Sequence, residues 1–361
     1  MRILLATPGT DVGGAERVVI TLAQELPLRG HEVVLWGPAG ALEPELAGAR
    51  VQRVTVPSRG RSPAGVAEGV ASLAATIRRA RPHVVHAHNP RVAALAALGA
   101  RLGRGPRRPR VLATFHGVRR AEYRAASLLL RGADAVSCVS EDLATGLRQA
   151  GLAADRLHVL ANSVRVPEAR DPERDARLDA ELGLTGAPVV IAVGRLVEQK
   201  NHARFLDAAA EVAAVRPDAR FLVVGDGPLR AELTAQARSL GLEDRLTLTG
   251  VRHDVPALAA RADLVVFSSD WEGLSLVALE ALAAGTPVLS TPVEGMRDLV
   301  EGGAVTVTRT AAASDLAREM LALLADPARL EVLGARGRDL VAAHYSTATM
   351  LDGYERLYRM L

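Results

Sequence analysis

Residues 264–291 read LVVFSSDWEGLSLVALEALAAGTPVLST. The continuous apolar, β-branched run at 264–267 predicts a strand buried on both faces of a parallel sheet. Residues 276–284 are rich in alanine and leucine, which predicts a helix, and Gly285 stands where a left-handed helix cap is expected. A second apolar run from residue 287 begins the next strand. The stretch therefore predicts strand, helix and parallel strand, the repeating unit of an α/β fold.

Two glutamates stand out in this stretch. Glu272 falls in the loop between the predicted strand and helix, and Glu280 lies two turns further along the helix. Ligands of open α/β sheets bind at the carboxyl ends of strands, and helix N-termini attract phosphate groups. A carboxylate there accepts hydrogen bonds from sugar hydroxyls. Solvated helix charges are the simpler alternative, but the position of the pair favours a site for a sugar and a phosphate.

A second motif, GRLVEQKN at residues 194–201, follows another predicted buried strand at 189–193. It contains Arg195 and Lys200, and Lys200 is the only lysine of the chain. Two fixed cations after a strand would stabilise the negative charge that develops on a leaving diphosphate. Arginine binds phosphate bidentately, whereas lysine acts as a point charge. Two surface cations without a ligand are the alternative interpretation.

The first half of the chain holds two weaker signals. Gly13 and Gly14 follow the predicted strand at 2–6, and glycines let a backbone approach a diphosphate closely. The loop lacks the Gly-Lys-Ser/Thr ending of a P-loop and the full dinucleotide pattern. His116 follows a predicted strand at 111–114, so it is a candidate for the site as well as for a structural role.

Together these motifs resemble those of the retaining glycosyltransferases of family 4, in the GT-B superfamily. The resemblance extends over nearly the whole chain and is strongest between residues 189 and 291. The chain departs from the family pattern at Asn201, where glycine is usual, which concerns the local turn. The resemblance implies transfer of a sugar from a UDP- or GDP-sugar to a hydroxyl acceptor, with retained anomeric configuration and with no metal or other cofactor required.

The resemblance also assigns roles to individual residues. Glu272 would hold the hydroxyls of the donor sugar, Glu280 would hold the ribose, and His116 would lie near the transferred sugar, so that His116 and Glu272 are the catalytic candidates. The implied diphosphate-binding residues are Arg195, Lys200, Gly13 and Gly14. The implied sugar- and nucleoside-binding residues are Glu272, Gly273, Leu274, Ser275, Leu276, Val277, Glu280 and Val251.

The predicted fold is α/β, a GT-B architecture of two doubly wound Rossmann-like domains facing a cleft. Repeated strand–helix alternation predicts an N-terminal acceptor-side domain at 1–163. A proline-rich, charged linker with a short helix is expected at 164–187, and a donor-binding domain at 188–344. The resemblance implies that a C-terminal helix within 345–361 packs back on the first domain.

Charge is distributed unevenly along the 361 residues. Residues 1–165 hold 23 Arg against 12 Asp and Glu, a net of +11, whereas the remainder has a net of −8. The arginines concentrate between Arg101 and Arg131, which favours reversible contact with an anionic membrane, although a merely solvated surface is an equal alternative. No nucleic-acid-binding motif or interleaved aromatic residues occur, so nucleic acid is not expected as a partner. A single cysteine, Cys138, and no apolar run near 18 residues predict a cytoplasmic protein, at most peripheral on the inner face of the membrane.

The motif His83-x-x-His86-x-His88 resembles a metal site at first inspection. On a strand, His86 and His88 would share one face while His83 points to the other. No further ligand set follows, and no Asp-x-Asp occurs in the chain. We therefore expect no metal site, consistent with a cation pair that takes the place of a metal.

Two other functions remain open at this stage. A nucleotide-sugar epimerase shares the architecture, but it is not expected to combine both motifs. A non-catalytic binder of nucleotide sugars is the second, and the intact set Arg195, Lys200, Glu272 and Glu280 argues against it. The acceptor is open: lipid-linked saccharide, phospholipid, polysaccharide and small molecules, in cell-envelope glycan, glycolipid or secondary-metabolite synthesis.

Overall fold

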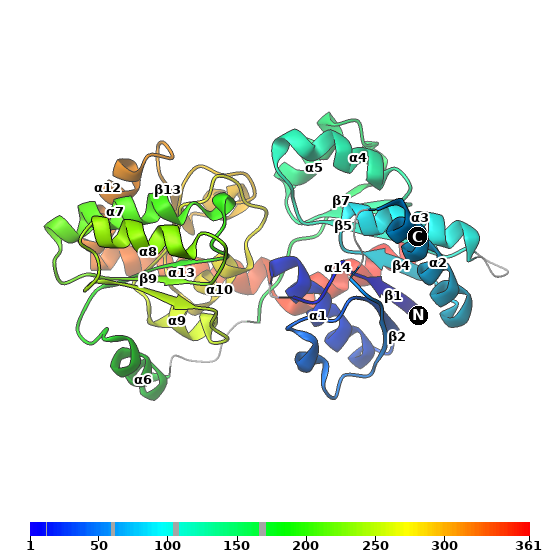
Figure 1. The fold of residues 1–361 in the computed structure, drawn as a ribbon, viewed down its shortest axis with the longest axis horizontal. Helices are drawn as coiled ribbons and strands as arrows, with labels where there is room; N and C mark the ends of the chain where they lie inside the picture. The colour runs from blue at the N-terminus through cyan, green and yellow to red at the C-terminus, as the bar shows by residue number, and fades with distance from the viewer. Residues whose placement is uncertain (12, 59–61, 104–107, 166–170) are drawn as a thin grey trace. The chain divides into compact units, whose positions relative to one another are not determined.

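A computed structural model describes residues 1–11, 13–58, 62–103, 108–165 and 171–361. The chain forms two compact units (Figure 1). The first comprises residues 1–162 together with 348–361, and the second comprises residues 163–347. The second unit therefore includes the helix α6 (Pro172–Leu182) in the segment expected to be a linker. Residues 166–170 of that segment lie outside the described ranges.

The first unit is built on a seven-stranded parallel sheet in the order β3-β2-β1-β4-β5-β6-β7. Its strands are β1 (Arg2–Ala6), β2 (Glu32–Gly37), β3 (Val51–Thr55), β4 (Val84–Ala87), β5 (Arg110–Phe115), β6 (Ala135–Cys138) and β7 (Leu157–Val159). Its helices are α1 (Gly14–Leu28), α2 (Pro63–Ala80), α3 (Pro90–Leu102), α4 (Tyr123–Leu130), α5 (Glu141–Gln149) and, from the end of the chain, α14 (Thr347–Met360). The predicted doubly wound sheet is confirmed.

The second unit is built on a six-stranded parallel sheet in the order β10-β9-β8-β11-β12-β13. Its strands are β8 (Val189–Val193), β9 (Arg220–Val224), β10 (Leu246–Gly250), β11 (Leu264–Phe267), β12 (Val288–Ser290) and β13 (Val305–Val307). Its other helices are α7 (His202–Val215), α8 (Arg230–Ser239), α9 (Val255–Arg261), α10 (Leu276–Ala284), α11 (Arg297–Glu301), α12 (Ala313–Leu324) and α13 (Pro327–His344). The strand and helix predicted from residues 264–291 have the expected bounds.

Local chemistry explains where several helices begin and end. Gly285 adopts a φ of 81° at the end of α10, the left-handed conformation that glycine takes at little cost. Ser140 caps α5, because its hydroxyl accepts a hydrogen bond from the amide of Leu143 at 3.4 Å. These short-range signals are readable in the sequence, which is why the predicted elements agree with the structure.

The C-terminal helix α14 belongs to the first unit. Its buried face consists of Met350, Leu351, Gly353, Tyr354, Leu357 and Tyr358. Tyr354 and Tyr358 are each 1% exposed, and their hydroxyls reach the polar side chains of β4 and β5. The helix is therefore held by aromatic packing and by specific hydrogen bonds together. Within the described residues, no helix has both the length and the apolar content needed to cross a membrane.

Strand order reverses once in each sheet, and these points position the candidate site. In the first unit the reversal lies between β1 and β4, and in the second it lies between β8 and β11. At such a switch point the loops leaving the two central strands diverge to opposite faces, which opens a crevice at their carboxyl ends. The motifs singled out in the sequence follow β1 and β5 in the first unit, and β8 and β11 in the second.

Candidate active site

The two motifs of the second unit are joined by hydrogen bonds between their loops. The amide of Asp270 donates to the carbonyl of Gln199 at 2.9 Å, and the side chain of Gln199 donates to the carbonyl of Trp271 at 3.1 Å. The hydroxyl of Ser268 donates to the carbonyl of Lys200 at 2.9 Å. The loop after β8 and the loop after β11 are therefore one hydrogen-bonded assembly, because β8 and β11 are adjacent strands.

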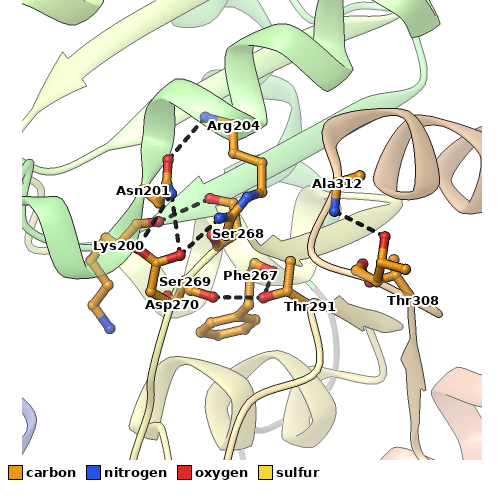
Figure 2. A network of polar contacts seen from close by, with 11 residues as sticks. Lys200, Asn201, Arg204, Phe267, Ser268, Ser269, Asp270, Thr291, Thr308 and Ala312 are labelled. Atoms are coloured by element: carbon orange, nitrogen blue, oxygen red, sulfur yellow. Dashed lines mark hydrogen bonds and ion pairs between the residues drawn. The ribbon is translucent and has the colours of Figure 1, made fainter. Parts of the chain in front are cut away.

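Asn201 completes this assembly, at the position where the resemblance led us to expect glycine. It adopts φ 44° and ψ 50°, the left-handed conformation that glycine favours and that asparagine tolerates best among the other residues. Its side chain caps α7 by accepting from the amide of Arg204, and it donates to the carboxylate of Asp270 at 3.2 Å (Figure 2). Arg204 binds Asp270 as well, at 2.8 Å. The turn is therefore preserved, and asparagine adds contacts that glycine lacks.

Lys200 and Glu272 form an ion pair in the middle of this assembly. The ammonium of Lys200 lies 2.6 Å from Oε1 of Glu272, and the side chains are 19% and 5% exposed. The hydroxyl of Ser269 also donates to the same carboxylate oxygen. Lys200, expected to bind the phosphate, and Glu272, expected to bind the sugar hydroxyls, thus form an ion pair with each other in this structure. A buried carboxylate requires such a partner, since its desolvation is otherwise very costly.

Two glycines outside the two motifs make close backbone contacts there, and neither contact was foreseen from the sequence. A Cβ atom on Gly295, which has φ 85°, would lie 2.5 Å from the carbonyl carbon of Gly273. A Cβ atom on Gly225 would lie 2.1 Å from the carbonyl oxygen of Gly194. The loops after β12 and β9 therefore press directly on the loops that hold Glu272 and Lys200. A glycine's use in a remote backbone contact leaves no local signal in a single sequence.

The remaining predicted residues of the second unit lie in the loops after β8, β10 and β11 and in helix α10. Arg195 is exposed in the loop after β8, and Glu280 is partly buried in the second turn of α10. Val251 is 53% exposed just after β10. The segment from Gly273 to Val277 runs from the loop into the first turn of α10, and its members Leu274 and Leu276 are buried. Gly273, Ser275 and Val277 are partly exposed.

In the first unit, Gly13 precedes α1 with an extended backbone at φ −177°, and Gly14 is the first residue of the helix. Both follow β1, at the switch point of their sheet, while Val12 lies outside the described residues. His116 follows β5, and its Nε2 atom lies 3.4 Å from Nδ1 of His88. Burial lowers the pKa of His116 to about 4, so the ring is neutral at physiological pH.

The histidine motif of β4 arranges itself as the alternation of a strand requires. The rings of His86 and His88 share one face, with centroids 4.1 Å apart. His83 is exposed and accepts a hydrogen bond from the amide of Arg2 instead. Within the described part of the chain, no group of three or more His, Cys, Asp or Glu side chains is arranged to hold a metal ion.

Comparisons with known proteins identify the family to which the chain belongs. A family model for glycosyl transferases group 1 matches residues 175–340, and a model for glycosyltransferase family 4 matches residues 12–166. The 2-deoxystreptamine N-acetyl-D-glucosaminyltransferase of Streptomyces fradiae is 31% identical over 85% of this chain and 80% of that protein. The chain belongs to this glycosyltransferase family.

Other relatives match a smaller part of the chain. The alpha-D-kanosaminyltransferase of Streptomyces kanamyceticus is 33% identical over 59% of this chain. The chain spans 56% and 62% of the length of the two curated Streptomyces kanamyceticus relatives that it matches. The crystal structure of Anabaena Alr3699/HepE in complex with UDP and glucose has a TM-score of 0.89, with 23% identity and coverage of 100% of both chains. The chain therefore has the GT-B fold, with two Rossmann-like domains.

The ion pair generates a prediction about stability. Lys200→Met should lower the free energy of unfolding by about 3 kcal/mol, because it leaves the carboxylate of Glu272 buried without its charged partner. Adding Glu272→Gln to Lys200→Met should restore most of that loss. Urea unfolding of the single and double variants measures the coupling.

Arg238→Met is the matched control, since Arg238 pairs with Glu243 on the surface of the same unit with side chains 68% and 60% exposed. This control should change stability by less than about 1 kcal/mol. Strictly additive losses for Lys200→Met and Glu272→Gln would contradict the coupling.

The buried histidines generate a prediction about pH. Burial lowers the pKa of His86 to about 3 and that of His202 to about 4. In the unfolded chain both rings have a pKa of about 6.5, so the unfolded state binds protons before the folded state does as the pH falls. The contribution of the neutral rings to the free energy of unfolding is complete above about pH 6.5. It declines below that pH, by about 1 kcal/mol for each ring at about pH 5.5.

The melting temperature should therefore fall between about pH 7.5 and about pH 5.5, a range in which ordinary carboxylates stay ionised. His202→Leu should reduce this dependence, whereas the exposed His83→Gln should keep it. A melting temperature that is constant across the range would show that the rings are not held neutral.

Proposed function

We propose that this glycosyltransferase moves a sugar from a UDP- or GDP-sugar to a hydroxyl acceptor with retention of anomeric configuration. The observation that supports this most directly is the ion pair of Lys200 and Glu272 at the carboxyl ends of β8 and β11. A sugar diphosphate presents an anion and hydroxyl donors side by side, which matches an ammonium and a carboxylate held 2.6 Å apart. Donor binding would replace the ion pair between Lys200 and Glu272 by a contact of Lys200 with the diphosphate and a contact of Glu272 with the sugar hydroxyls.

The proposal gives each residue a task. Lys200 and Arg195 hold the diphosphate as its charge grows during bond cleavage. Glu272, with the amides of residues 273–277, holds the sugar hydroxyls, and Glu280 holds the ribose. Val251 belongs to the loop that lines the nucleoside. Gly13, Gly14 and His116, all of the first unit, are included through the family resemblance.

Retention would follow from reaction on one face of the sugar. The bond between the anomeric carbon and the diphosphate oxygen breaks, and the acceptor oxygen bonds to that carbon on the same face. The acceptor's proton passes to the leaving phosphate oxygen, so no side chain needs to act as the base. The cation pair supplies the charge stabilisation that a metal supplies elsewhere, and on this ground we propose that turnover needs no metal and no other cofactor.

The relatives support a transferase rather than the epimerase or the non-catalytic binder considered above. Their names include a lipopolysaccharide core biosynthesis glycosyltransferase of Rhizobium meliloti, 28% identical over 96% of this chain, and the 2-deoxystreptamine N-acetyl-D-glucosaminyltransferase of Streptomyces fradiae. We therefore propose a role in bacterial polysaccharide, glycolipid or secondary-metabolite synthesis in the cytoplasm.

The first unit is also proposed to contact anionic membranes reversibly. Leu98, Leu102 and Leu128 are 46%, 65% and 61% exposed on α3 and α4, which pack against each other. The exposed Arg101 and Arg124 lie on the same helices, while Arg104 and Arg107 are outside the described residues. Exposed leucines flanked by arginines suit a surface of acyl chains and acidic headgroups, with about 1 kcal/mol gained per arginine at such a surface.

Vesicle sedimentation tests the membrane proposal. Binding to vesicles with acidic lipids should fall as salt rises, and Leu102→Ser should weaken it while leaving the charge unchanged. Leu28→Ser, on an exposed leucine at the end of α1, is the control. Equal binding to neutral and acidic vesicles, or none at low salt, would favour a merely solvated surface.

The central test of the proposed function is a donor panel. Calorimetry with UDP, GDP and their sugars should identify one base, and mass analysis of products from bacterial lipid extracts and small hydroxyl acceptors should identify the acceptor class. Turnover should survive EDTA. No binding of any nucleotide sugar would overturn the function, and a loss of turnover on chelation that manganese restores would overturn its metal independence.

The two glutamates should fail differently when each is changed to glutamine. Glu272→Gln should reduce kcat strongly while diphosphate affinity holds or rises, because Lys200 is freed from its internal partner. Glu280→Gln should weaken donor and free diphosphate alike, by about 1–3 kcal/mol. Arg195→Ala is the comparison for a lost phosphate contact, with about 1.5–3 kcal/mol expected. Full turnover in Glu272→Gln, or unchanged diphosphate affinity in Glu280→Gln, would show that the roles are wrong.

A further inference from the structure

Two histidines of the β4 motif, His86 and His88, have no part in the proposed function, yet His88 lies directly beside His116 and His86 lies against His88. The parallel strands β4 and β5 are neighbours, so side chains at their carboxyl ends meet in pairs. In the inner pair, Nε2 of His86 lies 2.7 Å from Oγ1 of Thr114. In the outer pair, Nδ1 of His88 lies 3.4 Å from Nε2 of His116. The two histidines of one strand therefore face Thr114 and His116 of the next.

The inner pair is fixed from the C-terminal helix. The hydroxyl of Tyr358 lies 2.8 Å from Nδ1 of His86, and the hydroxyl of Tyr354 lies 3.1 Å from Oγ1 of Thr114. Ser137 of β6 bonds to Thr114 as well, at 2.7 Å. Both ring nitrogens of His86 are thus occupied. The ring of His86 packs against the ring of His88, and this contact helps to hold His88 in place.

The outer pair has one nitrogen on each ring without a partner. These are Nε2 of His88 and Nδ1 of His116, both of them buried. His88 is 2% exposed, and the rings of His88 and His116 lie with centroids 5.7 Å apart and nearly parallel. Burial, with the neighbouring histidines, lowers the pKa of His88 well below its usual value, and the pKa of His116 is about 4.

Neutrality links the protons of the two rings. A neutral imidazole carries one N–H and one bare nitrogen. Within the hydrogen bond of the pair, one nitrogen must be the N–H and the other must be bare. When Nδ1 of His88 donates, Nδ1 of His116 carries the proton of that ring; when it accepts, Nδ1 of His116 is bare. The tautomer of His116 is therefore tied to that of His88.

We propose that His88 is a positioning residue for the transfer reaction: it holds the ring of His116 and fixes which tautomer His116 presents at the carboxyl end of β5. This inference rests on the proposed function, in which His116 acts beside the transferred sugar. His88 follows β4, which borders the switch point of its sheet, the place where such sheets take their ligands. The ring of His116 is held by the hydrogen bond to His88 and lies nearly parallel to the ring of His88, which keeps it in the fixed orientation that a reacting group needs.

Three substitutions of His88 separate the hydrogen bond from the volume of the ring. Asparagine places its amide near the position of Nδ1 and retains a polar partner for His116. Glutamine places its amide further out, near the position of Nε2, and leucine fills the space without any polar atom. His83→Leu, on the exposed histidine of the same motif, is the matched control.

Nitrogen-15 spectra of the histidine rings report the tautomer of His116 without any donor. We expect one neutral tautomer in the unaltered protein, in His83→Leu and in His88→Asn, and a mixture in His88→Gln and His88→Leu. Hydrolysis of the donor chosen from the UDP- and GDP-sugar panel reports function. In His88→Gln and His88→Leu kcat should fall about ten- to a hundredfold with KM little changed, and His88→Asn should retain most of kcat.

The outcomes distinguish this inference from the function on which it rests. Equal loss of kcat in all three His88 variants, or a loss with the tautomer of His116 unchanged, would overturn the positioning role. A changed tautomer with unchanged kcat would overturn the assignment of His116 to the reaction. If His88→Leu does not fold, the comparison of His88→Asn with His88→Gln decides. If the unaltered protein binds no nucleotide sugar, the proposed function fails, and the ring spectra still decide whether His88 sets the tautomer.

Discussion

The ion pair between Lys200 and Glu272 is the interaction on which the loops of the candidate site in the second unit depend. Each group would be costly to bury alone, and together they are held by loops from adjacent strands that share several hydrogen bonds. Asn201 and Arg204 fix one loop through Asp270, and Gly295 lets a third loop close against the backbone of Gly273. The unit is thus built to keep an ammonium and a carboxylate close together at one edge of a sheet.

Sheet topology explains why this assembly lies where it does. The order β10-β9-β8-β11-β12-β13 reverses between β8 and β11, and the two motifs leave those two strands. The first unit has the same arrangement. Its strand order reverses between β1 and β4, and the glycine loop follows β1 while His88 follows β4. A charged or titratable side chain at a switch point is placed by backbone hydrogen bonds on both sides, which limits its freedom before any ligand arrives.

Much of the fold was predictable because its signals are local. The apolar run of β11, the alanine- and leucine-rich α10 and the glycine cap at Gly285 depend on neighbours within a few residues, and the structure has them at the expected bounds. The motif residues Arg195, Lys200, Glu272 and Glu280 were recognisable for a similar reason, since each motif is contiguous. Arg204, Asp270 and Gly295 were missed, and the backbone contact of Gly225 was not foreseen, because these contacts join segments far apart in the chain.

The sequence by itself determined the strand–helix alternation, the strand ends that carry the site residues, and the glycosyltransferase motifs, because periodicity, caps and contiguous motifs are written in the order of residues. Only the tertiary structure decided that the ammonium of Lys200 lies on the carboxylate of Glu272, that Asn201 takes the left-handed turn, and that His88 lies beside His116. Such pairings arise from the register of neighbouring strands and the packing of loops between them, and a linear pattern does not specify which side chains a sheet brings within hydrogen-bonding distance.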